Sequence, residues 1–207
     1  VLVVILAKIF NKRIIIKMTL VCHDDPYFIR NRGIIINHFY RMSNIYISIS
    51  PKFKNLYIRS NLPFNRLVEI PNGVDLTTFT QSTNKERLKL RKSLNLPGNA
   101  IIILFVGHWS SSHKNPYVLF SAWNDYISNL YPESVLVFVG SQNENHFDVD
   151  CALVDKIRDQ VKPYLNDRIF IVEQTDHIEN YYKSANIFVL SSLKEGLPNS
   201  LLEAMAC

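Results

Sequence analysis

The C-terminal stretch EGLPNSLLEAMAC, residues 195 to 207, is the most informative part of this sequence. The apolar run Ile187 to Leu190 precedes it and indicates a buried strand, whereas the residues from Ser200 onward are helix formers. Gly196 and Pro198 keep the helix from starting earlier, so backbone N–H groups remain available at its N-terminus. A helix N-terminus of this kind suits an anionic ligand such as a phosphate.

Two carboxylates flank this turn, Glu195 before the loop and Glu203 in the first helical turn. Between them they would suit a ligand that carries both hydroxyls and phosphates. Two other interpretations stay open at this point. Ser200-x-x-Glu203 is also the pattern of a capping box, in which Glu203 bonds back to the N-cap backbone. Glu195 also fits a solvated residue of a loop.

The whole string resembles the signature of retaining glycosyltransferases of family 4, which have the GT-B fold. Carboxylate spacing, glycine, proline and helix all coincide in it. The resemblance implies that Glu195 meets the hydroxyls of the donor sugar, as a catalytic residue, and that Glu203 binds the nucleotide ribose. The further donor-binding residues that it implies in this stretch are Gly196, Leu197, Pro198, Asn199 and Ser200.

Apolar strands and helices alternate in the second half of the chain. The segments expected as strands are 100–106, 134–139, 168–172 and 187–190, and those expected as helices are 115–130, 152–164 and 177–184. Strands that are apolar throughout, separated by helices, indicate a parallel sheet covered on both faces. We therefore expect a Rossmann-like lobe.

The N-terminal part of the chain has the strand and helix pattern expected for the C-terminal half of a further α/β domain. Residues 13–20, 45–50 and 67–70 are expected to be strands, with a helix over 51–61. The apolar run over residues 1–10 is too short to span a bilayer, and we interpret it as the end of a packed helix that stops near Asn11. Because the chain starts without methionine and stops inside a predicted helix, we expect a fragment.

IPNGVDLTTF, residues 70 to 79, contains the turn dipeptide Asn-Gly. It resembles the linker that joins the two lobes of GT-B enzymes. The expected fold class is therefore α/β, a GT-B fragment with two Rossmann-like lobes. Residues 1–71 would form the C-terminal part of the acceptor-side lobe, 72–83 the linker, and 84–207 a truncated nucleotide-sugar-binding lobe.

Composition and charge fit a globular protein with two different halves. The chain is 47% hydrophobic with a mean hydropathy of +0.01, and the three cysteines Cys22, Cys151 and Cys207 lack metal-ligand spacing. Free thiols in a reducing cytosol are the expected state, which places the protein in the cytoplasm. Residues 1–66 contain eleven Lys and Arg and two Asp, which gives this segment a net charge of +9. Because the whole chain has a net charge of +5, residues 67–207 have a net charge of −4.

Aromatic residues are interleaved with these cations, among them Tyr27, Phe28, Phe39 and Tyr40. This pattern suits peripheral docking to an anionic membrane surface or an acidic acceptor, and equally a solvated basic face. A nucleic-acid partner is not expected, because the cations form no recognisable binding motif.

The first strand-to-helix turn of the second lobe contains a candidate diphosphate site. Gly107 allows close backbone approach, and Lys114 precedes a helix N-terminus. By composition alone, Lys114 is also an ordinary surface lysine. The resemblance implies Gly-Arg…Lys at these positions, and the chain departs from it because His108 stands where arginine is common. The second cation is therefore in question, and the alternatives are His108, His113 or an unusual orientation of the donor.

Two further turns carry candidate residues. His23 follows a strand of the first lobe, and the resemblance implies a catalytic histidine there that faces the donor sugar. A loop histidine bonded to Asp24 or Asp25 is the alternative, and those two carboxylates before a proline are typical turn formers. Glu173-Gln174-Thr175 follows the third strand of the second lobe. The resemblance places this segment near the nucleotide base, and the alternative is a polar connection.

Asp148-x-Asp150 matches the motif of metal-dependent glycosyltransferases of a different fold, but it lies in a polar loop of a Rossmann-like lobe. We therefore expect neither a metal nor a cofactor. The expected function is hexosyltransferase-type transfer of a sugar from a nucleotide-diphosphate sugar to a glycan or lipid-linked acceptor, with retention of configuration. The alternative is a sugar-nucleotide-binding module without catalysis.

Overall fold

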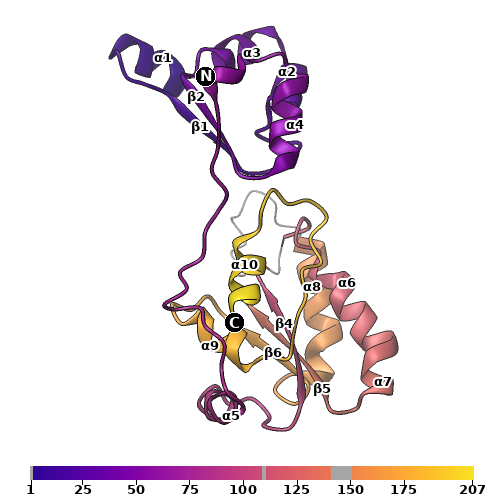
Figure 1. The fold of residues 1–207 in the computed structure, drawn as a ribbon. Helices are drawn as coiled ribbons and strands as arrows, with labels where there is room; N and C mark the ends of the chain where they lie inside the picture. The colour runs from indigo at the N-terminus through magenta and orange to yellow at the C-terminus, as the bar shows by residue number, and fades with distance from the viewer. Residues whose placement is uncertain (1, 109–110, 141–150) are drawn as a thin grey trace. The chain divides into compact units, whose positions relative to one another are not determined.

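The computed structural model describes residues 2–108, 111–140 and 151–207. The chain forms two compact units (Figure 1). Unit 1 comprises Val1–Gly73 together with Lys194–Pro198, and unit 2 comprises Val74–Leu193 together with Asn199–Cys207. Each unit therefore consists of two segments of the chain.

Unit 1 is built on a three-stranded parallel sheet of order β1-β2-β3. Its strands are β1 (Ile15–Met18), β2 (Ile45–Ser48) and β3 (Leu67–Glu69). Its helices are α1 (Leu2–Ile9), α2 (Pro26–Asn31), α3 (Ile34–Arg41) and α4 (Pro51–Arg59), followed by a 3-10 turn at Phe64–Arg66. All three strands lie within the segments predicted from the sequence.

Aromatic side chains fill the core of unit 1. Tyr46, Phe53 and Tyr57 are fully buried, and the rings of Tyr46 and Tyr57 lie 5.1 Å apart. The Tyr57 hydroxyl donates to the carbonyl of Pro63 at 2.8 Å. Burial raises the pKa of Tyr46 to about 12, so this hydroxyl stays protonated at neutral pH. The sheet and α4 are thus joined by packed rings whose polar ends have partners.

Three helices of unit 1 differ from what the sequence pattern indicates. α1 is helical as expected, but it has no buried side chain, and Leu2 is 68% exposed and Val3 76%. α2 and α3 are not predicted. α2 starts because the Asp25 carboxylate accepts the N–H of Phe28 at 2.8 Å and Pro26 occupies the first turn. Gly33, with φ +122°, separates the two helices.

Unit 2 contains a four-stranded parallel sheet of order β6-β5-β4-β7. The strands are β4 (Ile101–Val106), β5 (Ser134–Val139), β6 (Ile169–Val172) and β7 (Ile187–Phe188). The parallel sheets of both units confirm the predicted α/β class. β7 is shorter than the predicted strand over 187–190, although Val189 still donates to the carbonyl of Leu104.

Six α-helices are present in the part of unit 2 that the structure describes. They are α5 (Asn84–Ser93), α6 (Pro116–Ala122), α7 (Ser128–Leu130), α8 (Cys151–Val161), α9 (Ile178–Ser184) and α10 (Asn199–Ala206). The helix expected over 115–130 is continuous, with a π-helical turn at Trp123–Ile127 between α6 and α7. The buried Trp123 indole anchors this turn by donating to Ser134 Oγ at 3.0 Å.

Alternate side chains of the strands of unit 2 enter two separate cores, because successive residues of a strand point to opposite faces. On one face Phe105 and Phe138 pack with residues of α6 and α8. On the other face Leu104 and Val137 pack with Tyr181 and Tyr182 of α9. Helices therefore cover both faces of the sheet (Figure 1). Functional groups gather at its edge, where the loops leave the strands.

No helix in the described parts of the chain is both long and apolar enough to cross a lipid bilayer.

Candidate functional site

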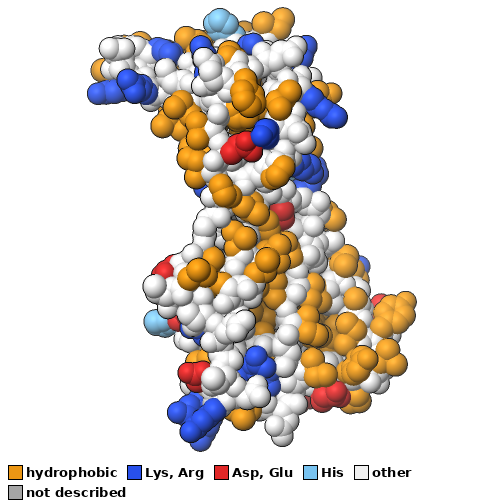
Figure 2. All heavy atoms as spheres, viewed as in Figure 1, with side chains coloured by type: hydrophobic (Ala, Val, Ile, Leu, Met, Phe, Trp, Pro, Cys, Tyr) orange, Lys and Arg blue, Asp and Glu red, His pale blue; other side chains and the backbone are white. Residues whose placement is uncertain are grey.

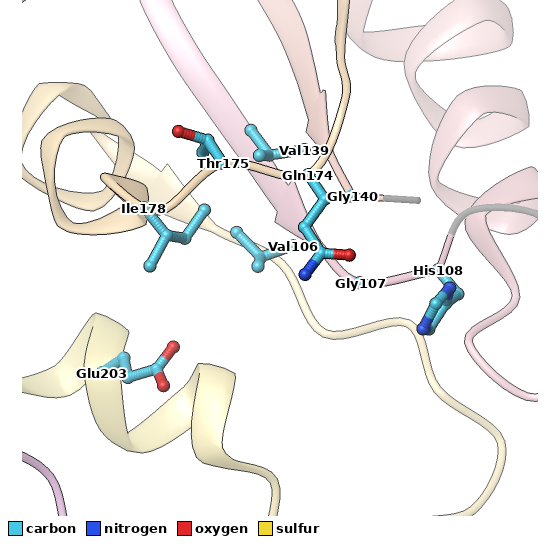
Figure 3. A pocket seen from close by; sticks show the side chains of 9 residues that line it. All are labelled: Val106, Gly107, His108, Val139, Gly140, Gln174, Thr175, Ile178 and Glu203. Carbon is cyan, nitrogen blue, oxygen red and sulfur yellow. The ribbon is translucent and has the colours of Figure 1, made fainter. Parts of the chain in front are cut away.

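The strand order of unit 2 creates a natural position for a ligand. From β4 the chain proceeds to β5 and β6 on one side and then returns to β7 on the other side of β4. Loops that leave β4 and β7 diverge at the carboxyl edge of the sheet, where open α/β sheets bind ligands. A cavity of about 280 Å³ lies at this edge (Figure 3). Its lining residues are Val106, Gly107, His108, Val139, Gly140, Gln174, Thr175, Ile178 and Glu203.

Two glycines bring backbone to the wall of this cavity. Gly107 follows β4 and Gly140 follows β5, with φ of +154° and +148°. A Cβ on Gly140 would lie 1.9 Å from the carbonyl oxygen of Gly107, so no other residue fits there without moving the backbone. The Gly107 N–H donates to the Val139 carbonyl at 2.9 Å, which fixes the turn. Sequence reasoning selected Gly107 and missed Gly140, whose available signal was a glycine directly after an apolar strand.

Glu203 projects from α10 into the cavity (Figure 3). Its Oε2 accepts a hydrogen bond from the Tyr182 hydroxyl at 2.9 Å. α10 begins at Asn199, so Ser200 lies inside the helix and not at the N-cap position that the capping-box interpretation requires. A carboxylate has about four acceptor positions, so the bond to Tyr182 leaves capacity for ligand hydroxyls.

The segment after β6 contributes Gln174 and Thr175 to the cavity, and Ile178 adds an apolar wall from the start of α9. Figure 3 shows the Gln174 amide projecting between Val106 and Gly107. Glu173, the residue selected from the sequence, is not among the lining residues. The segment after β6 is a loop in which both Gln174 and Thr175 face the cavity, so the strand pattern does not determine which side chain lines it.

The loop after β4 holds the predicted diphosphate residues together. His108 lines the cavity, and the side chain of Lys114 runs along Gly107, where a Cβ would lie 3.6 Å from Lys114 Cδ. This loop is tied to the segment after β7, because Ser191 Oγ donates to the Lys114 carbonyl at 2.9 Å and Leu193 N donates to His113 O at 2.8 Å. The two loops at the switch point are therefore mutually bonded.

The predicted sugar-binding loop is divided between the units. Lys194–Pro198, which includes Glu195, belongs to unit 1, whereas Asn199 and Ser200 open α10 in unit 2. Within unit 1, a Cβ on Gly196 would lie 2.2 Å from the Thr19 carbonyl oxygen. Leu197 packs against the core of unit 1, and its carbonyl accepts from Asn72 Nδ2 at 2.9 Å.

The turn after β1 contains His23, which is exposed. The carboxylate of Asp24 accepts from the Thr19 hydroxyl at 2.6 Å and from the Leu20 N–H at 3.0 Å. Asp25 accepts from the Cys22 N–H at 2.6 Å and also caps α2. These bonds confirm that the two aspartates form the turn, as their sequence context indicates.

Among the residues that the structure describes, no group of three His, Cys, Asp or Glu side chains is placed to hold a metal ion. Asp148 and Asp150 lie outside the described residues.

Residues 86–207 match the family model described as glycosyl transferases group 1. One curated relative is UDP-Gal:alpha-D-GlcNAc-diphosphoundecaprenol alpha-1,3-galactosyltransferase of Escherichia coli, 38% identical over 66% of this chain and 33% of its own length. Another is N,N'-diacetylbacillosaminyl-diphospho-undecaprenol alpha-1,3-N-acetylgalactosaminyltransferase of Campylobacter jejuni, 27% identical over 84% of this chain and 44% of its own length. The chain thus spans less than half the length of these relatives.

Solved structures show the same fold over almost all of the chain. Anabaena HepE in complex with UDP-glucose matches 99% of this chain and 54% of its own, with a TM-score of 0.78 at 17% identity. A sucrose-phosphate synthase of Thermosynechococcus elongatus matches 84% of this chain and 41% of its own, with a TM-score of 0.67 at 28% identity.

Proposed function

Because the chain belongs to the glycosyl transferases group 1 family and has the GT-B fold, we propose that the protein transfers a sugar from a nucleotide-diphosphate sugar to an acceptor hydroxyl, with retention of configuration. One observation carries this proposal: the cavity at the carboxyl edge of the unit 2 sheet, where Glu203 and the backbone of two glycines line the same space. A carboxylate suits the hydroxyls of a ribose, and glycine backbone suits close approach of a diphosphate.

We assign the parts of the donor to residues of unit 2. Glu203 would hold the ribose, and the segment Glu173–Thr175 would contact the base. Gly107, His108 and Lys114 would contact the diphosphate, together with Asn199 and Ser200 at the N-terminus of α10. Cations and helix N-termini stabilise the negative charge that develops on a leaving diphosphate. The UDP-glucose complex of Anabaena HepE supports a nucleotide sugar as the donor.

The proposed reaction breaks the bond between the anomeric carbon and the diphosphate oxygen. The nucleoside diphosphate leaves with the bonding electrons and forms an ion pair with the sugar cation. The acceptor hydroxyl then attacks from the same face, and its proton passes to an oxygen of the leaving phosphate. Glu195, with Gly196, Leu197 and Pro198, would orient the transferred sugar, and His23 would contact it from the acceptor-side lobe. In this proposal residues 1–71 form the acceptor-side lobe, and residues 72–83 form the linker between the lobes.

For the acceptor we propose a glycan or a lipid-linked saccharide on the cytoplasmic side of the membrane. The Escherichia coli and Campylobacter jejuni relatives are both named for diphospho-undecaprenol substrates, which supports this class. These relatives are transferases, so the alternative of a non-catalytic binding module is not favoured.

We also propose that unit 1 contacts an anionic membrane surface. Ile34 and Ile35 at the start of α3 are 89% and 70% exposed, and the exposed Arg30 and Arg32 precede them. The guanidinium of Arg32 lies 5.8 Å from the centre of the Phe28 ring. Figure 2 shows hydrophobic side chains exposed among lysines and arginines on this unit. Apolar residues beside arginines suit insertion among anionic headgroups.

A donor panel tests the main proposal. Calorimetry on the full chain with UDP-, GDP- and ADP-sugars, with and without EDTA, should give saturable binding of one nucleotide class that chelation leaves unchanged. Incubation of that donor with undecaprenol-linked saccharides should give a product with the donor's anomeric configuration by NMR. Binding of no nucleotide would overturn the proposal, and an inverted product would overturn the retaining mechanism.

A further inference from the structure

Tyr182 is hydrogen-bonded to Glu203 within unit 2. Its side chain extends from α9 and is only 5% exposed. Phe79 packs edge-on against the ring at 5.9 Å between centroids, and Phe188 of β7 lies 5.7 Å away. A buried ring between two others has one orientation, so the position of its hydroxyl is fixed by packing.

The hydroxyl of Tyr182 donates to Glu203 Oε2 at 2.9 Å. Burial and the neighbouring carboxylate raise the pKa of Tyr182 above its ordinary value, so the donor proton is retained across the working pH range. A charge-assisted bond from a fixed donor limits the rotamers of an otherwise flexible glutamate.

We infer that Tyr182 is a positioning residue, which holds the Glu203 carboxylate in the orientation that receives the ribose hydroxyls of the donor. This inference rests on the proposed function of Glu203. It also gives a reason for a buried tyrosine at this point of α9. A phenylalanine would fill the same space and leave the carboxylate without its fixed partner.

The segment before α5 completes the support of Tyr182. Phe79 is held by Asp75, whose backbone carbonyl accepts its N–H at 2.9 Å. Lys183 Nζ donates to the Thr78 carbonyl at 2.8 Å, and Ser82 Oγ donates to the Lys183 carbonyl at 2.8 Å. This segment is therefore bonded to α9 on both sides of Phe79, and the aromatic support does not depend on a single contact.

Calorimetry on the full chain with UDP and with 2′-deoxy-UDP tests the inference. We expect Tyr182→Phe to weaken UDP binding about tenfold, the size of one charge-assisted hydrogen bond, and to change 2′-deoxy-UDP binding much less. The matched control is Tyr181→Phe, a neighbouring buried tyrosine on the same helix, which should leave both affinities unchanged. In a Glu203→Ala background, Tyr182→Phe should cause no further loss, because its effect passes through the carboxylate.

Each outcome decides a separate question. Unchanged UDP binding by a folded Tyr182→Phe variant would overturn the inference, as would an equal loss for UDP and 2′-deoxy-UDP. A further loss in the Glu203→Ala background would show that Tyr182 acts independently of the carboxylate, which also overturns it. If the wild-type chain bound none of the nucleoside diphosphates, the proposed function itself would fail. Thermal melts on every variant separate these results from unfolding.

Discussion

At the scale of single residues, substitution of the two glutamates of the 195–207 stretch should impair the enzyme in different ways. We expect Glu195→Gln to lower kcat about a hundredfold with little change in nucleotide affinity, because charge develops on the transferred sugar. Glu203→Gln should mainly raise the donor KM about tenfold, since ribose contacts are similar in the ground and transition states. The Gln side chain still accepts from Tyr182, so the melting temperature should change little.

Steady-state kinetics and thermal melts on both variants check this prediction. Equal losses of stability with normal kinetics in the folded fraction would show that both carboxylates are structural.

Lys114 gives a second prediction at this scale. Its side chain runs along Gly107, which lines the cavity. Lys114→Ala should weaken nucleoside diphosphate binding by about 1.5–3 kcal/mol while the fold is retained. The control is Lys85→Ala, an exposed lysine on α5. Calorimetry that gave the same affinity for both variants would contradict the assignment of Lys114 to the diphosphate.

The cavity residues show which parts of the site can be predicted from the sequence and which cannot. Glu203 was predicted through the resemblance of the whole 195–207 stretch to a family signature, because its spacing alone also fits a capping box, and Gly107 was selected as a glycine in the turn that precedes Lys114. Tyr182 was not, because a tyrosine on the apolar face of a helix has the same pattern whether or not its hydroxyl has a role. The segment Glu173–Thr175 was predicted as a whole, but which of its side chains line the cavity depends on the conformation of the loop after β6, which the sequence pattern does not specify.

At the scale of elements, the loop that contains Gly196 is fitted closely to unit 1. A Cβ on Gly196 would meet the Thr19 carbonyl at 2.2 Å and the Phe53 ring at 2.8 Å. We expect Gly196→Ala to lower the free energy of unfolding by about 1–3 kcal/mol, because backbone would have to move. Gly73→Ala, where nothing lies within 4 Å, is the matched control.

Denaturant unfolding of both glycine variants measures the difference. Equal midpoints would mean that the loop does not pack against Thr19 in solution.

Arg91 joins three elements of unit 2 and is only 4% exposed. Its guanidinium donates to the carbonyls of Gly98, Ala100 and Ser184 and to the side chain of Asn186. Arg91→Met should destabilise the protein by about 3 kcal/mol or more, because the buried bond to the Ser184 carbonyl and three partly buried bonds lose their donor. Lys92→Met, on the exposed neighbour, should change the unfolding midpoint little. Similar midpoints for the two variants would refute this account.

The helices α2 and α3 show why some elements escape prediction. Both are short, and the run Ile34 to Ile36 is β-branched, which favours a strand by propensity. The helix forms there because Gly33, with a positive φ, separates it from α2 and because α2 packs beside α3, and the second cause depends on tertiary structure. By contrast, the strands of unit 2 were predicted because each apolar run is bounded by polar residues.

At the scale of the whole molecule, the uneven charge supports a prediction about location. Residues 1–66 carry a net +9, and Ile34 and Ile35 are exposed among these cations. The double variant Ile34→Asn, Ile35→Asn should reduce binding to anionic vesicles at least about tenfold, since burying each isoleucine contributes about 1.5–3 kcal/mol. The control is Leu88→Asn, on an exposed leucine of unit 2.

Co-sedimentation with anionic and with neutral vesicles at rising salt measures this partitioning. Equal recovery of the wild-type protein with both vesicle types would contradict the proposed contact with an anionic membrane.

The two-segment composition of unit 1 limits how this protein can exchange its second half with that of a relative. Leu197 packs against the core of unit 1 although it lies more than a hundred residues after Gly73. A recombinant that joined this unit to the second half of a relative would receive a foreign Lys194–Pro198 segment. The glycine of the foreign segment would have to fit against the Thr19 turn of unit 1. Its leucine would have to fit into the core of unit 1. Natural or engineered swaps of the second half should therefore preserve the fold when that pentapeptide stays with unit 1.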